Sequence, residues 1–247
     1  MTKTILVTGA SRGIGRSAAI LAGKKGWSVA VNYMGNEAAA NEVVAAVRSA
    51  GGKAKAIQGD VSVESDVVSM FEQAGELGRL DGVVINAGIV APASRLMDMD
   101  SARMRRIFDV NVLGAYLCAR EAVIRLARSR GGNGGSIVIL SSAAARLGGP
   151  NEYVDYAGSK GAMDTLTIGL SKEVGPDAIR VNAIRPGLID TDIHASGGQP
   201  DRAQRLGITA PLGRPGTADE VGESIVWLLS DASSYVTGAL IDVTGGR

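Results

Sequence analysis

The sequence predicts an α/β domain in which a doubly wound parallel sheet lies between two layers of helices. Short apolar runs rich in branched residues alternate with longer amphipathic segments almost to the end of the chain. The runs are continuously apolar, which is typical of strands buried on both faces. The 247 residues are 45% hydrophobic and show no repeat or composition break, so we expect one domain over residues 1–247.

Seven apolar runs are expected as strands, at residues 4–8, 28–32, 54–57, 82–85, 136–140, 179–184 and 239–243. Helical periodicity fills the gaps, with segments expected at residues 18–21, 36–50, 62–71, 101–129, 153–174 and 217–228. Ser62 is expected to cap its helix, and Thr217 with Glu220 has the pattern of a capping box. This alternation predicts right-handed βαβ units.

Residues 188–214 are the exception, because they are rich in Gly, Pro and polar residues without clear periodicity. A long, weakly patterned segment in a compact domain usually has a function. We therefore expect a lid over a substrate site.

Composition excludes several classes of protein. A net charge of +1 gives no electrostatic footprint for nucleic acid or an acidic membrane. Cys118 and His194 are the single cysteine and histidine, so an internal disulfide, a cysteine zinc cluster and a multi-histidine metal site are excluded. No apolar stretch resembles a signal peptide or a membrane span. We expect a soluble, cytoplasmic protein without a metal.

The first turn has the pattern of a phosphate-binding loop. Gly9, Gly13 and Gly15 follow the first strand and precede a helix, with the spacing G-x-x-x-G-x-G. Glycines allow a tight turn and a close approach of a pyrophosphate, and the helix N-terminus offers unpaired N–H groups. The turn therefore predicts nucleotide binding.

The same residues also read as G-x-S-x-G, the nucleophile elbow of serine hydrolases, with Ser11 as nucleophile. That alternative would require His194 as the base. The elbow normally follows several strands, and nothing precedes this one that could supply a second oxyanion donor. The hydrolase is therefore the weaker hypothesis.

The end of the second strand bears on the choice of cofactor. An acidic residue there would bind a ribose 2′-hydroxyl and repel a 2′-phosphate. Asn32 is neutral, and Arg12 in the glycine turn could neutralise a 2′-phosphate. NADP is therefore favoured over NAD, although Met34 stands where a second basic residue would have strengthened the case. Asp60 is placed to accept a hydrogen bond from an adenine amino group, or to cap the next helix.

Chemistry is expected after the fifth strand. Tyr156 and Lys160 are four residues apart and so share one helical face. A neighbouring ammonium lowers the pKa of a phenol, which makes an acid/base suited to a carbonyl–alcohol pair. Ser142, at the end of the strand, can hydrogen-bond the same substrate oxygen.

Together these motifs resemble the short-chain dehydrogenase/reductases over essentially the whole chain. The matching residues are Thr8, Gly9, Gly13, Gly15, Asp60, Asn86-Ala87-Gly88, Asn111, Ser142, Tyr156, Lys160, Pro186-Gly187 and Tyr235-x-Thr237-Gly238. The resemblance implies a seven-stranded Rossmann sheet and a catalytic tetrad of Asn111, Ser142, Tyr156 and Lys160. Tyr is then the acid/base, Ser holds the substrate oxygen, and Lys lowers the Tyr pKa and binds the nicotinamide ribose. Asn supports a proton-relay water in a helix kink.

The resemblance also implies the cofactor contacts. They are expected at Gly9, Ser11, Arg12, Gly13, Ile14, Gly15, Asn32, Asp60, Val61, Asn86, Ala87, Gly88, Tyr156, Lys160, Pro186, Gly187, Ile189 and Thr191. Helices 101–129 and 153–174 would pair between subunits to give a homotetramer.

Two departures from the family pattern stand out. Ile85 replaces an asparagine before Asn86. The spacing from Ser142 to Tyr156 is one residue longer than is common, so Ser141 is a rival for the serine role.

Other conspicuous residues are interpreted structurally. His194 is expected as a solvated loop residue, with substrate contact as the alternative, and Cys118 as a small core residue. Tyr153 is a candidate for the pocket wall. The arginines of the fourth helical segment are expected on a solvated or subunit-facing surface, at positions Arg103, Arg105, Arg106, Arg120, Arg125, Arg128 and Arg130.

The predicted function is hydride transfer between NADP(H) and a small carbonyl or alcohol substrate. A 3-oxoacyl-carrier-protein reductase and a glucose or other sugar 1-dehydrogenase remain open within this class. A non-catalytic, NADP-sensing binding protein is the alternative from another class.

Overall fold

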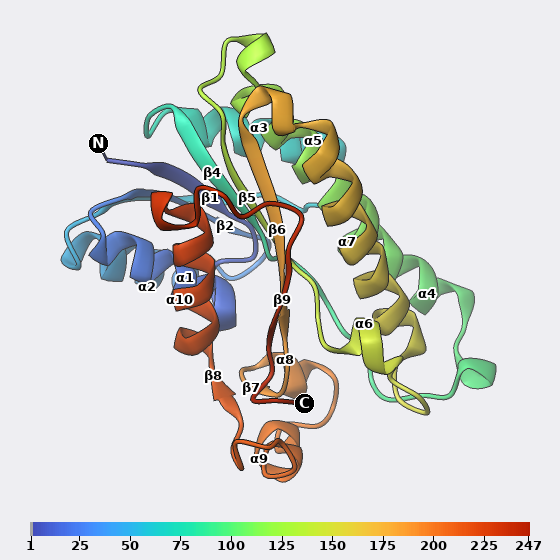
Figure 1. Ribbon diagram of the computed structural model, residues 1–247. Helices are drawn as coiled ribbons and strands as arrows, with labels where there is room; N and C mark the ends of the chain where they lie inside the picture. Colours follow the sequence, from blue (N-terminus) through green and yellow to red (C-terminus); the bar gives the residue numbers. More distant parts are fainter. Residues whose placement is uncertain (1) are drawn as a thin grey trace.

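A seven-stranded parallel sheet forms the centre of the computed structural model, which describes residues 2–247 (Figure 1). The strand order is β3-β2-β1-β4-β5-β6-β9, and every neighbouring pair is parallel. The strands are β1 (Thr4–Val7), β2 (Ser28–Tyr33), β3 (Lys53–Gln58), β4 (Leu80–Ile85), β5 (Gly135–Leu140), β6 (Ile179–Pro186) and β9 (Leu240–Val243). The doubly wound sheet predicted from the sequence is confirmed.

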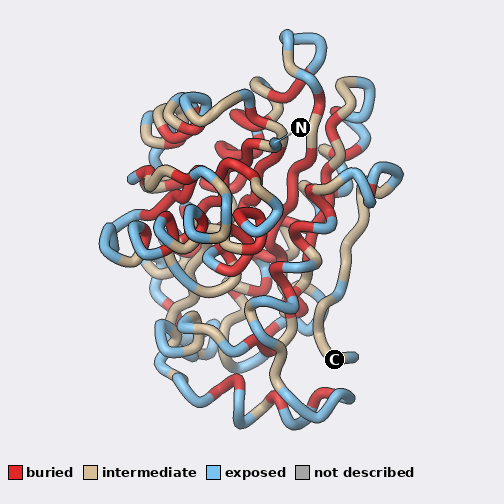
Figure 2. Tube along the Cα trace, turned by 90° about the vertical axis from the view of Figure 1, so that its left-hand side faces the viewer, coloured by how far each residue is buried: buried red, intermediate tan, exposed pale blue. Residues whose placement is uncertain are grey.

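Two helical layers cover the sheet, as Figure 1 shows. One layer is α1 (Gly13–Lys24), α2 (Glu37–Ser49) and α10 (Ala218–Leu229), and the other is α3 (Glu64–Gly75), α5 (Gly114–Leu126) and α7 (Val154–Glu173). Side chains alternate between the layers, with Ile5 and Val7 in one core and Leu6 in the other. In Figure 2 the buried residues, drawn in red, gather in the interior of the chain trace.

Local signals fixed some helix ends and not others. Thr217 and Glu220 form the expected capping box of α10. Ser62 does not cap α3, because the N-cap position is Val63 and the Ser62 hydroxyl donates to Asp60 instead. The segment expected as one helix over 101–129 is divided into α4 (Ser101–Phe108), a π-helical turn (Asp109–Leu113), α5 and a 3-10 turn (Arg128–Arg130).

Residues 188–214, the segment expected to form a lid, have more regular structure than their sequence suggests. This segment contains strand β7 (Ile189–Asp190), which pairs with β8 (Gly216–Thr217), and the short helices α8 (Ile193–Ser196) and α9 (Arg202–Gly207). In Figure 1 it lies below the carboxyl ends of β6 and β9. A short helix α6 (Ala144–Leu147) faces it from the loop after β5. These elements enclose the space where ligands of open parallel sheets bind.

Within residues 2–247, no helix is both long and apolar enough to cross a membrane. The same residues contain no group of three His, Cys, Asp or Glu side chains that could hold a metal ion. Cys118 is a fully buried core residue, as predicted, and burial raises the pKa of its thiol to about 12.

Candidate active site

The glycine turn is held against the end of β4. Gly9 and Gly13 have φ values of +61° and +56°, which favour glycine. The Asn86 Nδ2 group donates hydrogen bonds to the carbonyl oxygens of Thr8 (2.8 Å) and Gly9 (3.0 Å). Helix α1 then begins without a side-chain cap and without an acidic residue in its first turn. Its first N–H groups and its partial positive charge therefore suit a pyrophosphate.

Asn32 lies beneath this turn, and its expected contact with the cofactor ribose needs correction. The residue is 2% exposed. Its Oδ1 accepts the N–H of Gly9 at 3.0 Å, and its Nδ2 donates to the carbonyl of Gly59 at 3.1 Å. Asn32 therefore supports the turn from inside the protein, and the first well-exposed side chain after β2 belongs to Met34.

Asp60 stands at the end expected to hold adenine. Its Oδ1 accepts from the Ser62 N–H (2.9 Å) and hydroxyl (2.6 Å), and its Oδ2 is 3.6 Å from Nη2 of Arg106. Burial raises the pKa of Asp60, but these hydrogen bonds and the arginine charge hold it below its ordinary value. The same Arg106 nitrogen is 3.9 Å from the Met34 sulfur. The guanidinium of Arg106, on α4, therefore reaches the end of β2. The spacing of residues within one helix could not predict this contact between distant segments.

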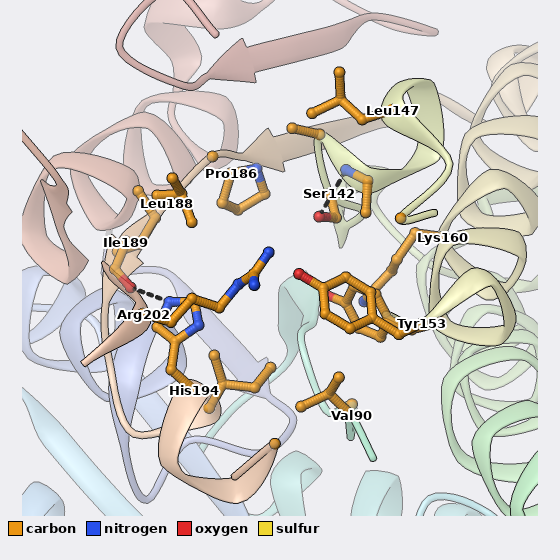
Figure 3. Close-up of a pocket in the computed structure, with 18 of the residues that line it drawn as sticks. Val90, Ser142, Leu147, Tyr153, Lys160, Pro186, Leu188, Ile189, His194 and Arg202 are labelled. Carbon is orange, nitrogen blue, oxygen red and sulfur yellow. Dashed lines mark hydrogen bonds between the residues drawn. The ribbon is translucent and has the colours of Figure 1, made fainter. Parts of the chain in front are cut away.

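Two serines follow β5, and their hydroxyls have different partners. Ser141 Oγ donates to the carbonyl of Lys160 at 3.1 Å and is buried. Ser142 Oγ accepts from the Ala144 N–H at 3.1 Å. Both serines line the cavity, where Figure 3 labels Ser142, but only the Ser141 hydroxyl is turned to a buried carbonyl, so Ser142 stays the predicted catalytic serine.

Tyr156 and Lys160 lie one turn apart on α7, with the Lys160 Nζ 5.6 Å from the Tyr156 ring centroid. The ammonium is buried and donates to the Leu140 carbonyl at 2.7 Å. Burial lowers the pKa of Lys160 to about 8, against the charge of Asp164. Burial raises the pKa of Tyr156, and the hydrogen bond with Ser142 opposes that rise. The lowering of the Tyr156 pKa by Lys160, expected from the sequence spacing, stays a prediction.

Asn111 lies in the π-helical turn, a feature common at functional sites. Its Oδ1 accepts from the Ile89 N–H at 2.8 Å, and its Nδ2 donates to Ser159 Oγ at 3.1 Å. A Cβ atom on Gly88 would lie 3.4 Å from Asn111 Oδ1 and 3.5 Å from Lys160 Nζ. Gly88 is therefore the small residue between these two polar groups.

The loop after β6 completes a cradle with the glycine turn. The Gly187 N–H donates to the Val243 carbonyl at 2.9 Å, which fixes the loop to β9. A Cβ atom on Gly13 would lie 3.6 Å from the Thr191 methyl group. The glycine turn, Gly88 and this loop therefore leave small residues and free N–H groups along one edge of the sheet, an arrangement that fits an extended dinucleotide.

A cavity of about 370 Å³ lies beside this cradle (Figure 3). Expected site residues that line it are Ile14, Asn86, Gly88, Ser142, Tyr156, Lys160, Pro186, Gly187, Ile189 and Thr191. Those that do not are Gly9, Ser11, Arg12, Gly13, Gly15, Asn32, Asp60, Val61, Ala87 and Asn111. Ser142, Tyr156 and Lys160 thus meet residues 188–214 at one cavity, whereas Asn111 and the residues expected at the adenine and the phosphates do not line it.

His194 corrects a second expectation, because it lines the cavity and is half-buried. Its Nε2 is 2.9 Å from the Ile189 carbonyl, which can only accept, so Nε2 carries the proton. Burial lowers the pKa of His194, which favours the neutral ring. Ser11 is not among the residues lining the cavity, so the serine-hydrolase alternative has no adjacent base.

Several arginines expected on the surface are paired with carboxylates. Arg103 Nε is 2.9 Å from Oδ2 of the buried Asp155, and Arg120 is 2.7 Å from Glu64. The sequence also gave no indication of Arg202, a buried residue of α9 that lines the cavity beside Tyr153. Its partner Glu152 is 50 residues away, so no local pattern links the two.

Comparisons with known proteins agree with this geometry. A family model described as enoyl-(acyl carrier protein) reductase matches residues 9–247. The chain is 52% identical over 243 residues to the uncharacterized oxidoreductase YgfF of Escherichia coli, with 98% of each chain covered. It is 38% identical over 247 residues to the L-rhamnose 1-dehydrogenase (NAD(P)(+)) of a Sphingomonas strain, covering 99% of this chain and 95% of the relative.

A solved short-chain dehydrogenase/reductase mutant from Serratia marcescens superposes with a TM-score of 0.90 at 30% identity, covering 99% of this chain and 97% of the other. The chain belongs to the short-chain dehydrogenase/reductase family. It is therefore an oxidoreductase of a family that uses NAD(P).

Proposed function

We propose that the protein is an NADP(H)-dependent oxidoreductase that interconverts a carbonyl compound and its alcohol. The observation that carries this proposal is the convergence of Ser142, Tyr156 and Lys160 on a cavity that Ile14 of the glycine turn also lines. When bound, the nicotinamide supplies or accepts the hydride. The residues described below supply orientation, charge and the proton.

The phenol of Tyr156 is the acid/base of this proposal. It gives its proton to the substrate oxygen during reduction and takes it back during oxidation. Ser142, which lines the same cavity, holds the same substrate oxygen. Lys160 lies within reach of Tyr156 and of Gly88, so it can bind the nicotinamide ribose and connect Tyr156 with Asn111.

A preference for NADP over NAD is the second part of the proposal. Arg12 is exposed and has no ion-pair partner within residues 2–247, so its charge is available to a phosphate. Arg106 supports the same preference, because its guanidinium reaches Met34, the position where the sequence lacks a basic residue. Neither Asn32, Tyr33 nor Met34 is acidic, so nothing at the end of β2 repels a 2′-phosphate.

The cofactor preference is tested with Arg12→Ala, Arg106→Ala and the control Arg105→Ala, which removes an exposed neighbouring arginine. We expect the ratio of kcat/KM for NADPH to that for NADH to fall about tenfold or more in each of the first two variants, because each removes a charged hydrogen bond to phosphate. The control should keep the wild-type ratio. An unchanged ratio in both test variants would show that neither Arg12 nor Arg106 binds a 2′-phosphate.

The reaction itself is tested by following NADPH and NADH oxidation across a panel of aldehydes and ketones, with the reverse reaction on alcohols and sugars. Turnover with at least one class is the expected result. NADPH binding without turnover of any member would favour the non-catalytic, NADP-sensing alternative.

We also propose a cytoplasmic homotetramer. Exposed apolar side chains on α4, α5 and α7, namely Phe108, Tyr116, Ile124 and Ile168, support pairing of these helices between subunits. Light scattering coupled to size-exclusion chromatography should give four times the 25.3 kDa chain mass. A monomer at micromolar concentration would contradict this.

A further inference from the structure

Two kinds of side chain line the cavity. The apolar ones include Val90, Leu147, Leu188, Ile193 and Leu206. The polar ones, called the polar wall below, include Glu152, Tyr153, His194, Gln199 and Arg202. Figure 3 shows the Arg202 side chain entering the cavity toward Tyr153, with His194 beside it.

The polar wall is centred on a bidentate ion pair. Arg202 Nη1 and Nη2 lie 2.6 Å and 2.8 Å from the two carboxylate oxygens of Glu152. The guanidinium carbon lies 5.1 Å above the Tyr153 ring, and Arg202 is 7% exposed. Burial raises the pKa of Glu152, but the hydrogen bond and charge of Arg202 outweigh it and keep the group ionised. The two charges cancel, so the wall carries no net charge to attract an anionic substrate.

Hydrogen-bonding capacity remains on this wall after the ion pair is made. A guanidinium has five N–H donors, and within residues 2–247 the Nε of Arg202 has no acceptor. Because His194 Nε2 carries the proton, its Nδ1 is an acceptor. The Tyr153 O–H faces the Glu152 carboxylate, which leaves the phenol oxygen as an acceptor, and the two carboxylate oxygens of Glu152 have further lone pairs. A hydroxyl group needs both roles from its partners, and this wall provides both.

The polar wall also lies close to the reacting centre. Tyr153 and Tyr156 meet edge to face, with ring centroids 5.7 Å apart. A substrate oxygen held by Tyr156 and Ser142 therefore places the neighbouring carbon atoms beside Tyr153 and the ion pair. The apolar lining residues would pack against the C–H groups of such a substrate.

We propose that the Glu152–Arg202 pair, with Tyr153 and His194, is the subsite that binds hydroxyl groups of a neutral, polyhydroxylated substrate of monosaccharide size. The inference rests on the proposed function, and it narrows the substrate class from carbonyl compounds in general to aldoses and related polyols. A long acyl chain has no hydroxyl groups to pair with the remaining donors and acceptors of this wall. Leaving buried polar groups without hydrogen bonds lowers the free energy gained on binding. The charged pair makes hydroxyl binding stronger than a neutral pair would.

The test compares NADP⁺-dependent oxidation of D-glucose, D-galactose, L-arabinose and L-rhamnose with that of 2-deoxy-D-glucose and cyclohexanol. We expect kcat/KM for the best aldose to exceed that for cyclohexanol by about 100-fold or more, because a site built for hydroxyls strongly rejects analogues that lack them. A double variant, Glu152→Leu with Arg202→Met, replaces the buried pair by apolar groups, a change that proteins often tolerate. It should reduce that ratio at least tenfold, because the loss in kcat/KM should fall on the aldoses and much less on cyclohexanol.

Arg205→Ala is the matched control, because Arg205 is a half-exposed arginine one turn further along α9. It should retain the wild-type ratio. The inference is overturned if cyclohexanol is as good a substrate as every aldose, or if the double variant lowers kcat/KM equally for all substrates, as a purely structural pair would. If cyclohexanol is oxidised and no aldose is, the proposed oxidoreductase function is supported and the hydroxyl-binding subsite is excluded. If no substrate is turned over in either direction, both proposals are excluded.

Discussion

The catalytic side of the cavity and the lid side are built in different ways. Ser142 follows a central strand, and Tyr156 and Lys160 stand on the 20-residue helix α7. Main-chain groups fix them, since Lys160 is bonded to Leu140 and Ser142 to Ala144. The lid has helices of only four and six residues, and its Ile208 and Leu212 are 69% and 68% exposed.

This difference indicates that the residues proposed for proton transfer and those proposed for substrate selection stand on different parts of the fold. Groups that transfer protons must keep their geometry, so they stand on long elements packed into the core. The lid is joined to the catalytic side by the Arg202–Glu152 ion pair, which links α9 to the loop before α7. Segments with few buried contacts open at low free-energy cost, which admits and releases ligands.

The largest expected effect is on the catalytic side. Tyr156→Phe removes the proton donor and should lower kcat about 10²- to 10⁴-fold, with the affinity for NADPH within threefold of wild type. Stopped-flow and fluorescence titration measure the two quantities. Tyr116→Phe, which changes an exposed tyrosine on α5, should leave both unchanged. Full turnover in the Tyr156 variant would exclude this phenol from proton transfer.

A second prediction concerns the stability of this side. The pKa of Lys160 falls from 10.5 to about 8 on burial, so the folded protein holds this proton less tightly than the unfolded chain. Stability should therefore rise with pH between about 8 and 10.5, by on the order of 3 kcal/mol, and Lys160→Met should abolish that rise. Urea unfolding of both proteins at pH 7, 9 and 10 measures the difference. Parallel pH profiles would contradict it.

The lid should respond to a smaller change. Arg202→Ala leaves the Glu152 carboxylate without its partner and removes the tie to the catalytic side. The free energy of lid opening should fall by about 1–2 kcal/mol, less than for a fully buried pair because Glu152 is partly exposed. Thermolysin should then cleave residues 188–214 about tenfold faster, whereas Arg205→Ala should cleave at the wild-type rate. Equal rates in all three proteins would show that another contact holds the lid.

The smallest effect is expected where the lid returns to the sheet. Thr217 accepts the Glu220 N–H at 3.2 Å, and Glu220 accepts the Thr217 N–H at 2.8 Å. Thr217→Ala should lower the free energy of unfolding by about 1 kcal/mol, the usual value of an N-cap. Urea denaturation measures it, and Thr217→Ser should restore most of the loss. No change in the alanine variant would mean that α10 is held by packing alone.

Features that depend on neighbours in the chain were predictable. The seven buried runs, the glycine turn and the Thr217–Glu220 box each draw on residues a few positions apart. The inward orientation of Asn32 and the reach of Arg106 to Met34 were not predictable in this way. Each depends on an atom from a segment more than 20 positions away in the chain.

By itself, the sequence determined the doubly wound sheet, the family and the spacing that puts Tyr156 and Lys160 on one face of a helix, because strand periodicity and helical pitch are local properties. Only the tertiary structure decided which polar groups face the cavity. It brought Arg202 to Glu152 and the Lys160 ammonium to the Leu140 carbonyl. Long-range packing selects those partners, since buried charges and N–H groups must be paired wherever the chain brings them together.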